Sequence, residues 1–156
     1  LGRFGGLQSA EIRMTRHPPA PRTAFRSFHP VQTRWQDNDQ YGHINNVTYL
    51  EYMDTVICLW QIEQGMDMSG ESAVRYLTVE SGCRYHAEAR FPDALTAGLR
   101  VGTLGNSSMR FEVALFREGE ETACVEGHFV LVAVDPETRP MRIPDRERAI
   151  LETILV

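Results

Sequence analysis

The sequence predicts an α+β domain in which one antiparallel sheet of about five strands curls around a single long central helix. Two observations carry this prediction. A helical pattern with a wide apolar side begins near residue 45, and strand-like segments separated by short turns fill most of the chain after residue 72. Because an antiparallel sheet cannot cover both of its faces by itself, a helix lying in its curl would complete the core.

The helix is expected from about Asn45 to Gln64, with Gly65 as its C-terminal cap. At ~100° per residue, the apolar side chains gather on one side: Tyr49, Leu50, Met53, Val56, Ile57 and Trp60, with Tyr52 and Leu59 at the margin. The opposite side carries Thr48, Glu51, Asp54, Thr55 and Gln61. The apolar arc covers about half of the circumference, which is wide for a surface helix, so the helix is expected to be enclosed.

The strands are expected on both sides of this helix. One strand precedes it at Ser27–Trp35, where Pro30 indicates an edge or a strand start. After the helix, Ala73–Phe91 is a long half-alternating segment with Gly82 as a candidate bulge. Three further strands follow at residues 96–105, 107–117 and 122–135, and a short helix is expected over Pro144–Leu155. The short gaps favour antiparallel meander pairing.

Length and composition bound the possible functions. The chain has 156 residues, 42% hydrophobic and 24% charged, with a formal net charge of −5. These values indicate one globular domain, here residues 25–156, and argue against nucleic acid as the main partner. Residues 1–24, rich in Gly, Pro and Arg, are expected to form a loose tail without a signal core, with Met14 as a candidate translation start. No apolar run is long enough to span a membrane.

Cysteine and histidine usage indicates neither disulfides nor a metal site. Cys58, Cys83 and Cys124 are widely spaced and odd in number, as expected for reduced thiols in a cytoplasmic protein. His29, His86 and His128 have no metal-ligand spacing. We therefore expect neither a metal nor a bound cofactor.

The segment DNDQYGHINNVTYLEYMD, residues 37–54, concentrates polar groups immediately before the helix. Asp39 could brace the loop, or it could act as a base or nucleophile. Asn45 and Asn46 suit a helix N-cap, and the free N–H groups of a helix start can stabilise an oxyanion. Gly42 suits a turn with positive φ or the close approach of a ligand.

The same segment resembles the hot-dog fold acyl-CoA thioesterases, the branch that includes 4-hydroxybenzoyl-CoA thioesterase. It matches the family pattern D-x-D-x-x-G-H-x-N-N-x-x-Y, from Asp37 to Tyr49. Weaker matches complete a resemblance that runs from Ser27 to Pro144: residues 79–81, 91–93, 105–108, 134–135 and 142–144. The resemblance implies a hot-dog fold and hydrolysis of an acyl- or aryl-coenzyme A thioester, with coenzyme A entering as part of the substrate.

The resemblance also implies roles for single residues. Asp39 would be the catalytic carboxylate, as base or nucleophile, and the amide of Asn46 would be the best oxyanion donor. His43 is either a loop-ordering residue or a general base, and Asp37 is expected to brace the loop. The substrate would be contacted by Gly42, Asn45 and Tyr49 near the thioester, and by Ser107, Ser108 and Arg84 near coenzyme A. Glu51 remains a minor catalytic candidate, and Glu80 could meet a partner subunit's site.

Assembly and two alternative functions complete the expectations. A curled sheet leaves an exposed edge, so we expect a homodimer or homotetramer. One alternative is a non-catalytic acyl-CoA-binding or regulatory module of the same fold. The other is a hot-dog hydroxyacyl dehydratase, which would require a His and acid pair placed for elimination. Alkyl and aryl acyl groups both remain open.

Overall fold

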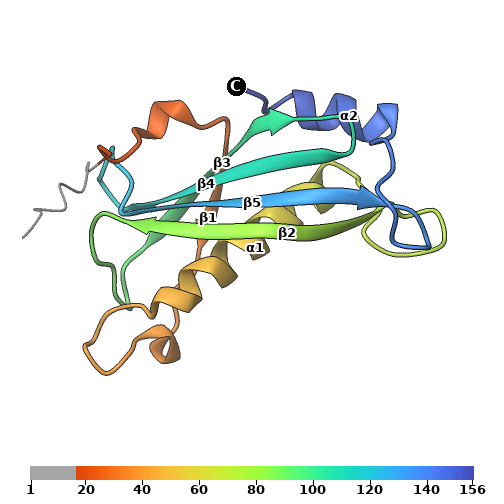
Figure 1. Cartoon of the computed structure of the whole chain (residues 1–156). Helices are drawn as coiled ribbons and strands as arrows, with labels where there is room; N and C mark the ends of the chain where they lie inside the picture. The colour runs from red at the N-terminus through yellow and green to blue at the C-terminus, as the bar shows by residue number, and fades with distance from the viewer. Residues whose placement is uncertain (1–16) are drawn as a thin grey trace, which may run out of the picture.

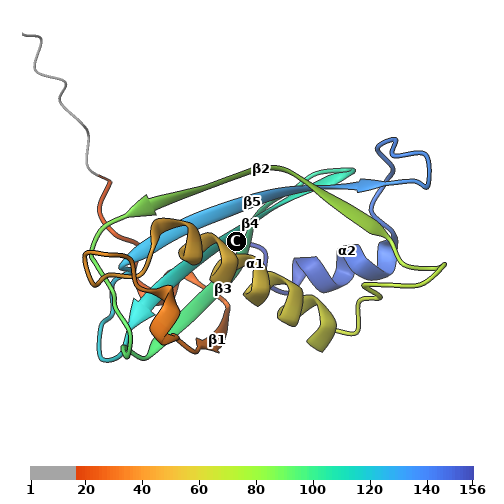
Figure 2. The ribbon, with the colours of Figure 1, turned by 90° about the horizontal axis from the view of Figure 1, so that it is seen from below.

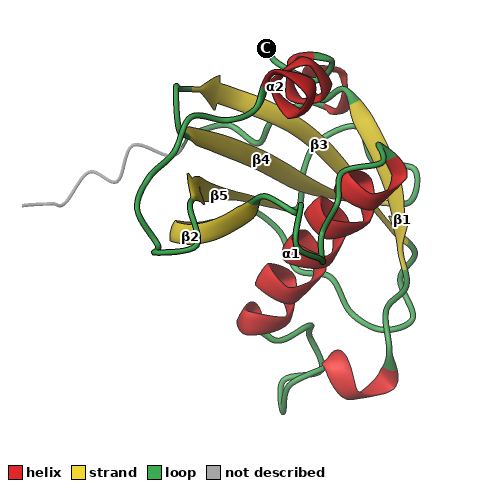
Figure 3. Ribbon diagram, turned by 90° about the vertical axis from the view of Figure 1, so that its right-hand side faces the viewer, coloured by secondary structure: helices red, strands yellow, loops and turns green. Residues whose placement is uncertain are grey.

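Helix α1 (Asn46–Glu63) lies in the hollow of a five-stranded antiparallel sheet (Figure 1). The computed structural model of the chain describes residues 17–156. The remaining elements are β1 (Ser27–Val31), β2 (Arg75–Tyr85), β3 (Leu95–Leu104), β4 (Ser108–Arg117), β5 (Val125–Val134) and the short helix α2 (Asp145–Glu152). Figure 3 shows the sheet curving around α1, so the predicted α+β architecture of a curled sheet around one central helix is confirmed.

The strand order in the sheet is β1-β3-β4-β5-β2. The meander prediction is correct for β3, β4 and β5 but wrong for β2, which pairs with β5 although β3 follows it in the chain. Residues 86–94 connect β2 to β3, and this connection is longer than the ~2–5 residues of a hairpin loop. The chain therefore passes from one side of the sheet to the other, and β1 and β2 become the two edges (Figure 2).

Several element bounds differ from the prediction. β1 ends at Val31, and Trp35–Asp37 forms a 3-10 helix (η2) instead of continuing the strand. β2 covers only Arg75–Tyr85, and its register shift falls between Thr78 and Glu80, so the predicted bulge at Gly82 is wrong. A Cβ atom at Gly82 would lie 3.1 Å from His128 Cε1, so close cross-strand packing is the reason for glycine there.

The buried side of α1 is largely the predicted one. Its buried residues are Tyr49, Tyr52, Met53, Val56, Ile57, Trp60 and Gln61. Met53 is fully buried and Trp60 packs edge-on against Phe111 of β4, with the ring centroids 5.9 Å apart. Two positions are reversed: Leu59 is exposed, and Gln61, predicted on the polar side, is 2% exposed. The main core therefore contains one buried amide side chain from α1.

The N-terminal segment begins to pack before the predicted boundary. Residues 1–16 of the predicted loose tail lie outside the described residues, but Arg22–Ala24 form a 3-10 helix (η1). The Arg22 N–H donates to the Glu121 carbonyl at 2.8 Å, and the Phe25 ring packs against Phe116 at 5.8 Å between centroids. Burial of Phe25 on the sheet face opposite α1 thus holds this segment in place.

The short helix α2 closes the end of the sheet near the β3–β4 turn. The Arg148 Nη2 donates to the Gly105 carbonyl at 2.5 Å, and the Tyr76 hydroxyl donates to the largely buried Glu147 carboxylate. Within residues 17–156, no helix is long and apolar enough to cross a membrane.

Candidate active site at the start of α1

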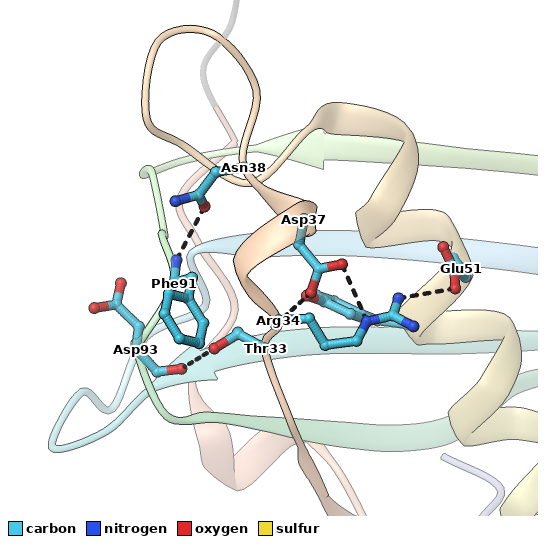
Figure 4. Close-up of polar contacts among 8 residues, drawn as sticks. Thr33, Arg34, Asp37, Asn38, Glu51, Phe91 and Asp93 are labelled. Atoms are coloured by element: carbon cyan, nitrogen blue, oxygen red, sulfur yellow. Dashed lines mark hydrogen bonds and ion pairs between the residues drawn. The ribbon is translucent and has the colours of Figure 1, made fainter.

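The segment before α1 is held by one buried carboxylate, Asp37, which is 3% exposed. The Arg34 N–H donates to Asp37 Oδ2 at 2.6 Å, and Arg34 Nε donates to Oδ1 at 3.2 Å. The hydroxyl of Tyr52, one turn and a half into α1, also donates to this carboxylate. Figure 4 shows Arg34 between Asp37 and Glu51. Arg34 Nη2 donates to Glu51 Oε1 at 3.1 Å.

The Asp37 backbone completes this connection, because the Asn45 N–H donates to the Asp37 carbonyl at 2.8 Å. Burial, and secondarily the hydrogen bond to Asp37, raise the pKa of Tyr52, so its hydroxyl remains a donor at neutral pH. Asp37 therefore ties residue 34, the N-cap of α1 and the first half of the helix into one unit, which is the bracing role that the sequence predicts.

Residues 38–44 form a closed loop around Asp39. The Asp39 N–H donates to the His43 carbonyl at 2.8 Å, and the Gly42 N–H donates to the Asp39 carbonyl at 3.1 Å. Asp39 Oδ1 accepts from the Tyr41 N–H at 2.8 Å and from the His43 N–H at 3.4 Å. Gly42 has φ +77°, the left-handed conformation that glycine adopts without strain.

The two carboxylate oxygens of Asp39 have different surroundings. Oδ1 is held by loop amides, whereas Oδ2 makes no hydrogen bond to any residue in the described range 17–156. Asp39 thus braces its own loop with one oxygen, keeps the other unpaired among the described residues, and lines the adjacent groove.

The first turn of α1 leaves one backbone donor open. Asn45 is the N-cap, and its side chain accepts from the Val47 N–H at 3.0 Å. The Thr48 N–H donates to the Asn45 carbonyl at 2.9 Å. Among residues 17–156, no acceptor pairs with the N–H of Asn46, the first helical residue. The helix start therefore offers one free N–H at its positive end.

These groups line one groove of about 580 Å³, which we call the Asp39 groove. Its walls come from the loop, from the start of α1, and from the segment after β2: Asp39, Tyr41, His43, Ile44, Asn46, Tyr49, Tyr85, His86, Ala87 and Glu88. His43 Nε2 lies 2.9 Å from Glu88 Oε2, so His43 links the loop to that segment. The sequence motif identified the first half of this lining but not residues 85–88, because these come next to the loop only when the sheet folds.

Two tyrosines, Tyr49 and Tyr85, line the Asp39 groove with their rings in contact. The rings of Tyr49 and Tyr85 lie 5.8 Å apart, and the Tyr85 hydroxyl donates to the Asn46 carbonyl at 3.1 Å. Burial raises the pKa of Tyr49 to about 12, so its hydroxyl is neutral and keeps a proton to donate. The same oxygen accepts from the Ala89 N–H at 3.2 Å.

Three predicted coenzyme A contacts lie elsewhere in the chain. Ser107 and Ser108 are at the β3–β4 turn, and Ser108 pairs with Val132, seven residues along β5 from the partner of Tyr85. That is about 23 Å along the strand. Arg84 points to the opposite sheet face from its neighbour Tyr85, where its Nη1 lies 3.8 Å from Glu126. One chain does not bring these residues to Asp39.

The predictions about cysteines and metal sites can be compared with the described residues. Cys58, Cys83 and Cys124 are free thiols, and Cys124 is buried. Within the described part of the chain, no group of three or more His, Cys, Asp or Glu side chains is arranged to hold a metal ion.

A family model described as the thioesterase-like superfamily matches residues 33–151, which include the whole loop, α1 and all strands after it. The chain belongs to this superfamily. The match begins two residues before η2 and extends into α2, so it covers every element that lines the Asp39 groove.

Known proteins similar to this superfamily member include both solved structures and a curated sequence. The PA5185 protein from Pseudomonas aeruginosa strain PAO1 is 44% identical with a TM-score of 0.84, covering 88% of this chain and 97% of that chain. A thioesterase from Thermus thermophilus, solved in complex with coenzyme A and Zn, is 26% identical with a TM-score of 0.68, covering 84% of this chain and 95% of that chain. The protein YsmA of Bacillus subtilis is 26% identical over 117 residues, covering 75% of this chain and 78% of its own.

The bracing role of Asp37 can be measured by unfolding. Replacing Asp37 with Ala leaves the buried Tyr52 hydroxyl and the Arg34 N–H without their acceptor. We expect a loss of about 1–3 kcal/mol in the free energy of unfolding in urea. Asp54→Ala, which removes an exposed carboxylate from α1, is the control and should change stability little. Equal stabilities of the two variants would contradict the bracing role.

Proposed function

We propose that this protein hydrolyses the thioester of an acyl- or aryl-coenzyme A to the free acid and coenzyme A. One observation carries the proposal: Asp39, which has a carboxylate oxygen without a partner among the described residues, and Asn46, whose N–H has no acceptor among them, line the same groove. A thioester requires an activated nucleophile and a donor for the oxyanion that develops. The general thioesterase assignment agrees with the superfamily, and bound coenzyme A in the T. thermophilus relative supports the choice of substrate.

In this mechanism the thioester carbonyl oxygen accepts a hydrogen bond from the Asn46 N–H at the positive end of α1. Asp39 Oδ2 then either removes a proton from an attacking water or attacks the carbonyl carbon itself to form an anhydride that water hydrolyses. In both routes the C–S bond breaks and coenzyme A leaves as a thiolate that takes up a proton. Asp39 Oδ1 stays on the loop amides, so the carboxylate keeps its orientation during the reaction.

The other groove residues have supporting roles in this proposal. His43, paired with Glu88, orders the loop, while Gly42 and Asn45 shape the approach and Tyr49 contacts the acyl group. Ser107, Ser108 and Arg84 remain predicted contacts of coenzyme A. We expect activity in the cytoplasm, without a metal ion or bound cofactor.

We further propose that the active protein is a homodimer formed through β2. The other edge strand, β1, has five residues and contains Pro30, which has no N–H to donate to a neighbouring strand. β2 has eleven residues, and Val79 near its middle is 62% exposed. Among the described strands, none pairs with the outer edge of β2. A second copy is the partner that this edge fits, because a two-fold axis pairs the strand with itself.

The catalytic role of Asp39 is tested by Asp39→Asn. Because the amide oxygen can still accept from the loop, the fold should persist, while kcat for acyl-CoA hydrolysis should fall by orders of magnitude. Release of free thiol from a panel of acyl-CoA esters measures the effect, with Glu118→Gln in the exposed β4–β5 turn as the control. Hydrolysis near the wild-type rate by folded Asp39→Asn would move the chemistry to another residue.

The oxyanion role of the Asn46 amide is tested by comparing proline and alanine at this position. Proline removes the N–H and suits the first position of a helix, and Asn45 already has the extended backbone (φ −58°, ψ 137°) that a following proline requires. We expect Asn46→Pro to fold and to lose roughly 10²–10³ in kcat relative to Asn46→Ala. If both folded variants have the same kcat, the donor is another amide.

Dimer formation through β2 is tested by sedimentation of the wild type and of Val79→Lys. A charge on an edge strand opposes pairing with a second strand. We expect a wild-type dimer at micromolar concentration and a shift of the variant to monomer, together with loss of hydrolysis. Leu59→Lys, at an exposed position of α1, is the control for surface charge. A fully active wild-type monomer would contradict the proposal.

A further inference from the structure

A second groove of about 520 Å³ lies between α1 and β2, at the opposite end of the helix from Asp39. We call it the α1–β2 groove. One wall is the C-terminal half of α1, including Asp54, Cys58 and Gln61, and the other is the first part of β2 from Arg75 to Thr78. Residues 68–70 also line it. None of the motif residues of the Asp39 loop lies in this groove.

The α1–β2 groove contains a buried donor without an acceptor. Gln61 is 2% exposed, and its Nε2 has no hydrogen-bond partner among the described residues. Buried side-chain amides are nearly always paired, because an unpaired donor loses its hydrogen bonds to water without replacement. Gln61 lines the groove, but Nε2 itself is buried. A turn of the terminal amide would bring Nε2 to an acceptor on a ligand in the groove, which would supply the missing partner.

Within one chain this donor is remote from the proposed chemistry. Asn46 and Gln61 are fifteen residues apart on α1, which is about 22 Å along the helix. An acyl group with its thioester at Asn46 and its far end at Gln61 of the same chain would have to run the length of the helix. A shorter path is available if the two groups come from different chains.

Pairing of β2 with a second copy brings the two grooves together. Helix α1 runs antiparallel to β2, because its start lies with Tyr85 in one groove and its end lies with Arg75 in the other. Pairing about Glu80, the middle residue of β2, places Arg75 of one copy opposite Tyr85 of the other. The Asp39 groove of one subunit then adjoins the α1–β2 groove of its partner, with the partner's Gln61 level with Asn46.

We propose that Gln61 is a specificity-determining residue that acts in the partner's active site. Its Nε2 donates a hydrogen bond to a neutral oxygen, hydroxyl or oxo, at the far end of the acyl group. This inference rests on the proposed thioesterase activity and on the β2 dimer, and it assigns the substrate class that those proposals leave open. The thioester sits at Asp39 and Asn46 of one chain, and the acyl group ends in the α1–β2 groove of the other.

Matched substrates test the specificity. The probes are benzoyl-CoA with para-hydroxybenzoyl-CoA, and a saturated acyl-CoA with the same chain carrying a terminal hydroxyl. We expect the wild type to prefer the hydroxylated member of at least one pair, and Gln61→Leu to lower its kcat/KM roughly tenfold or more. The pair that responds distinguishes aryl from alkyl substrates. Unchanged selectivity in Gln61→Leu would overturn the inference.

The melting temperature of Gln61→Leu distinguishes a substrate-binding role of Gln61 from a purely structural one. Leucine has nearly the volume of glutamine and no buried donor, so Gln61→Leu should keep or raise the melting temperature. If Gln61 only braced the fold, the melting temperature would fall and both members of each pair would lose activity equally. That result would also overturn the inference.

A mixed dimer tests whether Gln61 acts across the interface. We expect Asp39→Asn and Gln61→Leu subunits, co-expressed with different tags and purified as the heterodimer, to form one intact and one doubly altered site. The heterodimer should then recover about half of the wild-type kcat/KM for the preferred hydroxylated substrate, above both parent variants. Recovery no greater than half that of the Gln61→Leu homodimer would place Gln61 in its own subunit's site and overturn the cross-subunit assignment. Absence of all thioester hydrolysis by the wild type would instead defeat the proposed function, and the inference with it.

Discussion

The geometry of the candidate site depends on the burial of one charge, the carboxylate of Asp37. A buried carboxylate is costly unless its oxygens are hydrogen-bonded, and this one accepts from the Arg34 backbone and side chain and from the Tyr52 hydroxyl. Because those donors come from both sides of the loop, satisfying Asp37 fixes where the chain enters α1. The Asp37 carbonyl then binds the Asn45 N–H, so the N-cap and the open Asn46 amide follow in a determined place.

The crowding of polar residues at the start of a buried helix follows from two sets of demands on the same short segment. A loop that returns on itself must satisfy its own amides, and Asp39 Oδ1 and the Asn45 side chain do so. Next to each of these groups lies one that has no partner among residues 17–156: Asp39 Oδ2 in one case and the Asn46 N–H in the other. Bracing of the loop and the proposed chemistry therefore fall on neighbouring atoms of one segment. A residue that only capped the helix or only braced the loop would not also supply the proposed base or the proposed oxyanion donor.

The first part of the site could be predicted because it depends on neighbouring residues in the sequence. Features that depend on strand pairing and tertiary packing could not be predicted. The motif from Asp37 to Tyr49 and the amphipathic pattern of α1 are local, and the structure has the loop and helix at the predicted residues. The crossing of β2 to the far edge depends on sheet topology, so the sequence could not place Tyr85 beside Tyr49. Gln61 lies on the polar side of a helical projection, and tertiary packing, which such a projection does not include, buries it.

The two edges of the sheet differ in a way that their sequences explain. Unprotected edge strands invite aggregation, so they are commonly short or interrupted by proline, and β1 with Pro30 has both features. β2 has neither: it has eleven residues, it ends beside the Asp39 groove, and it begins beside the groove that contains Gln61. Since β2 borders both grooves, a strand paired along its outer edge would act on both at once. The outer edge of β2 is therefore the one place where the second copy that we propose would contact both grooves.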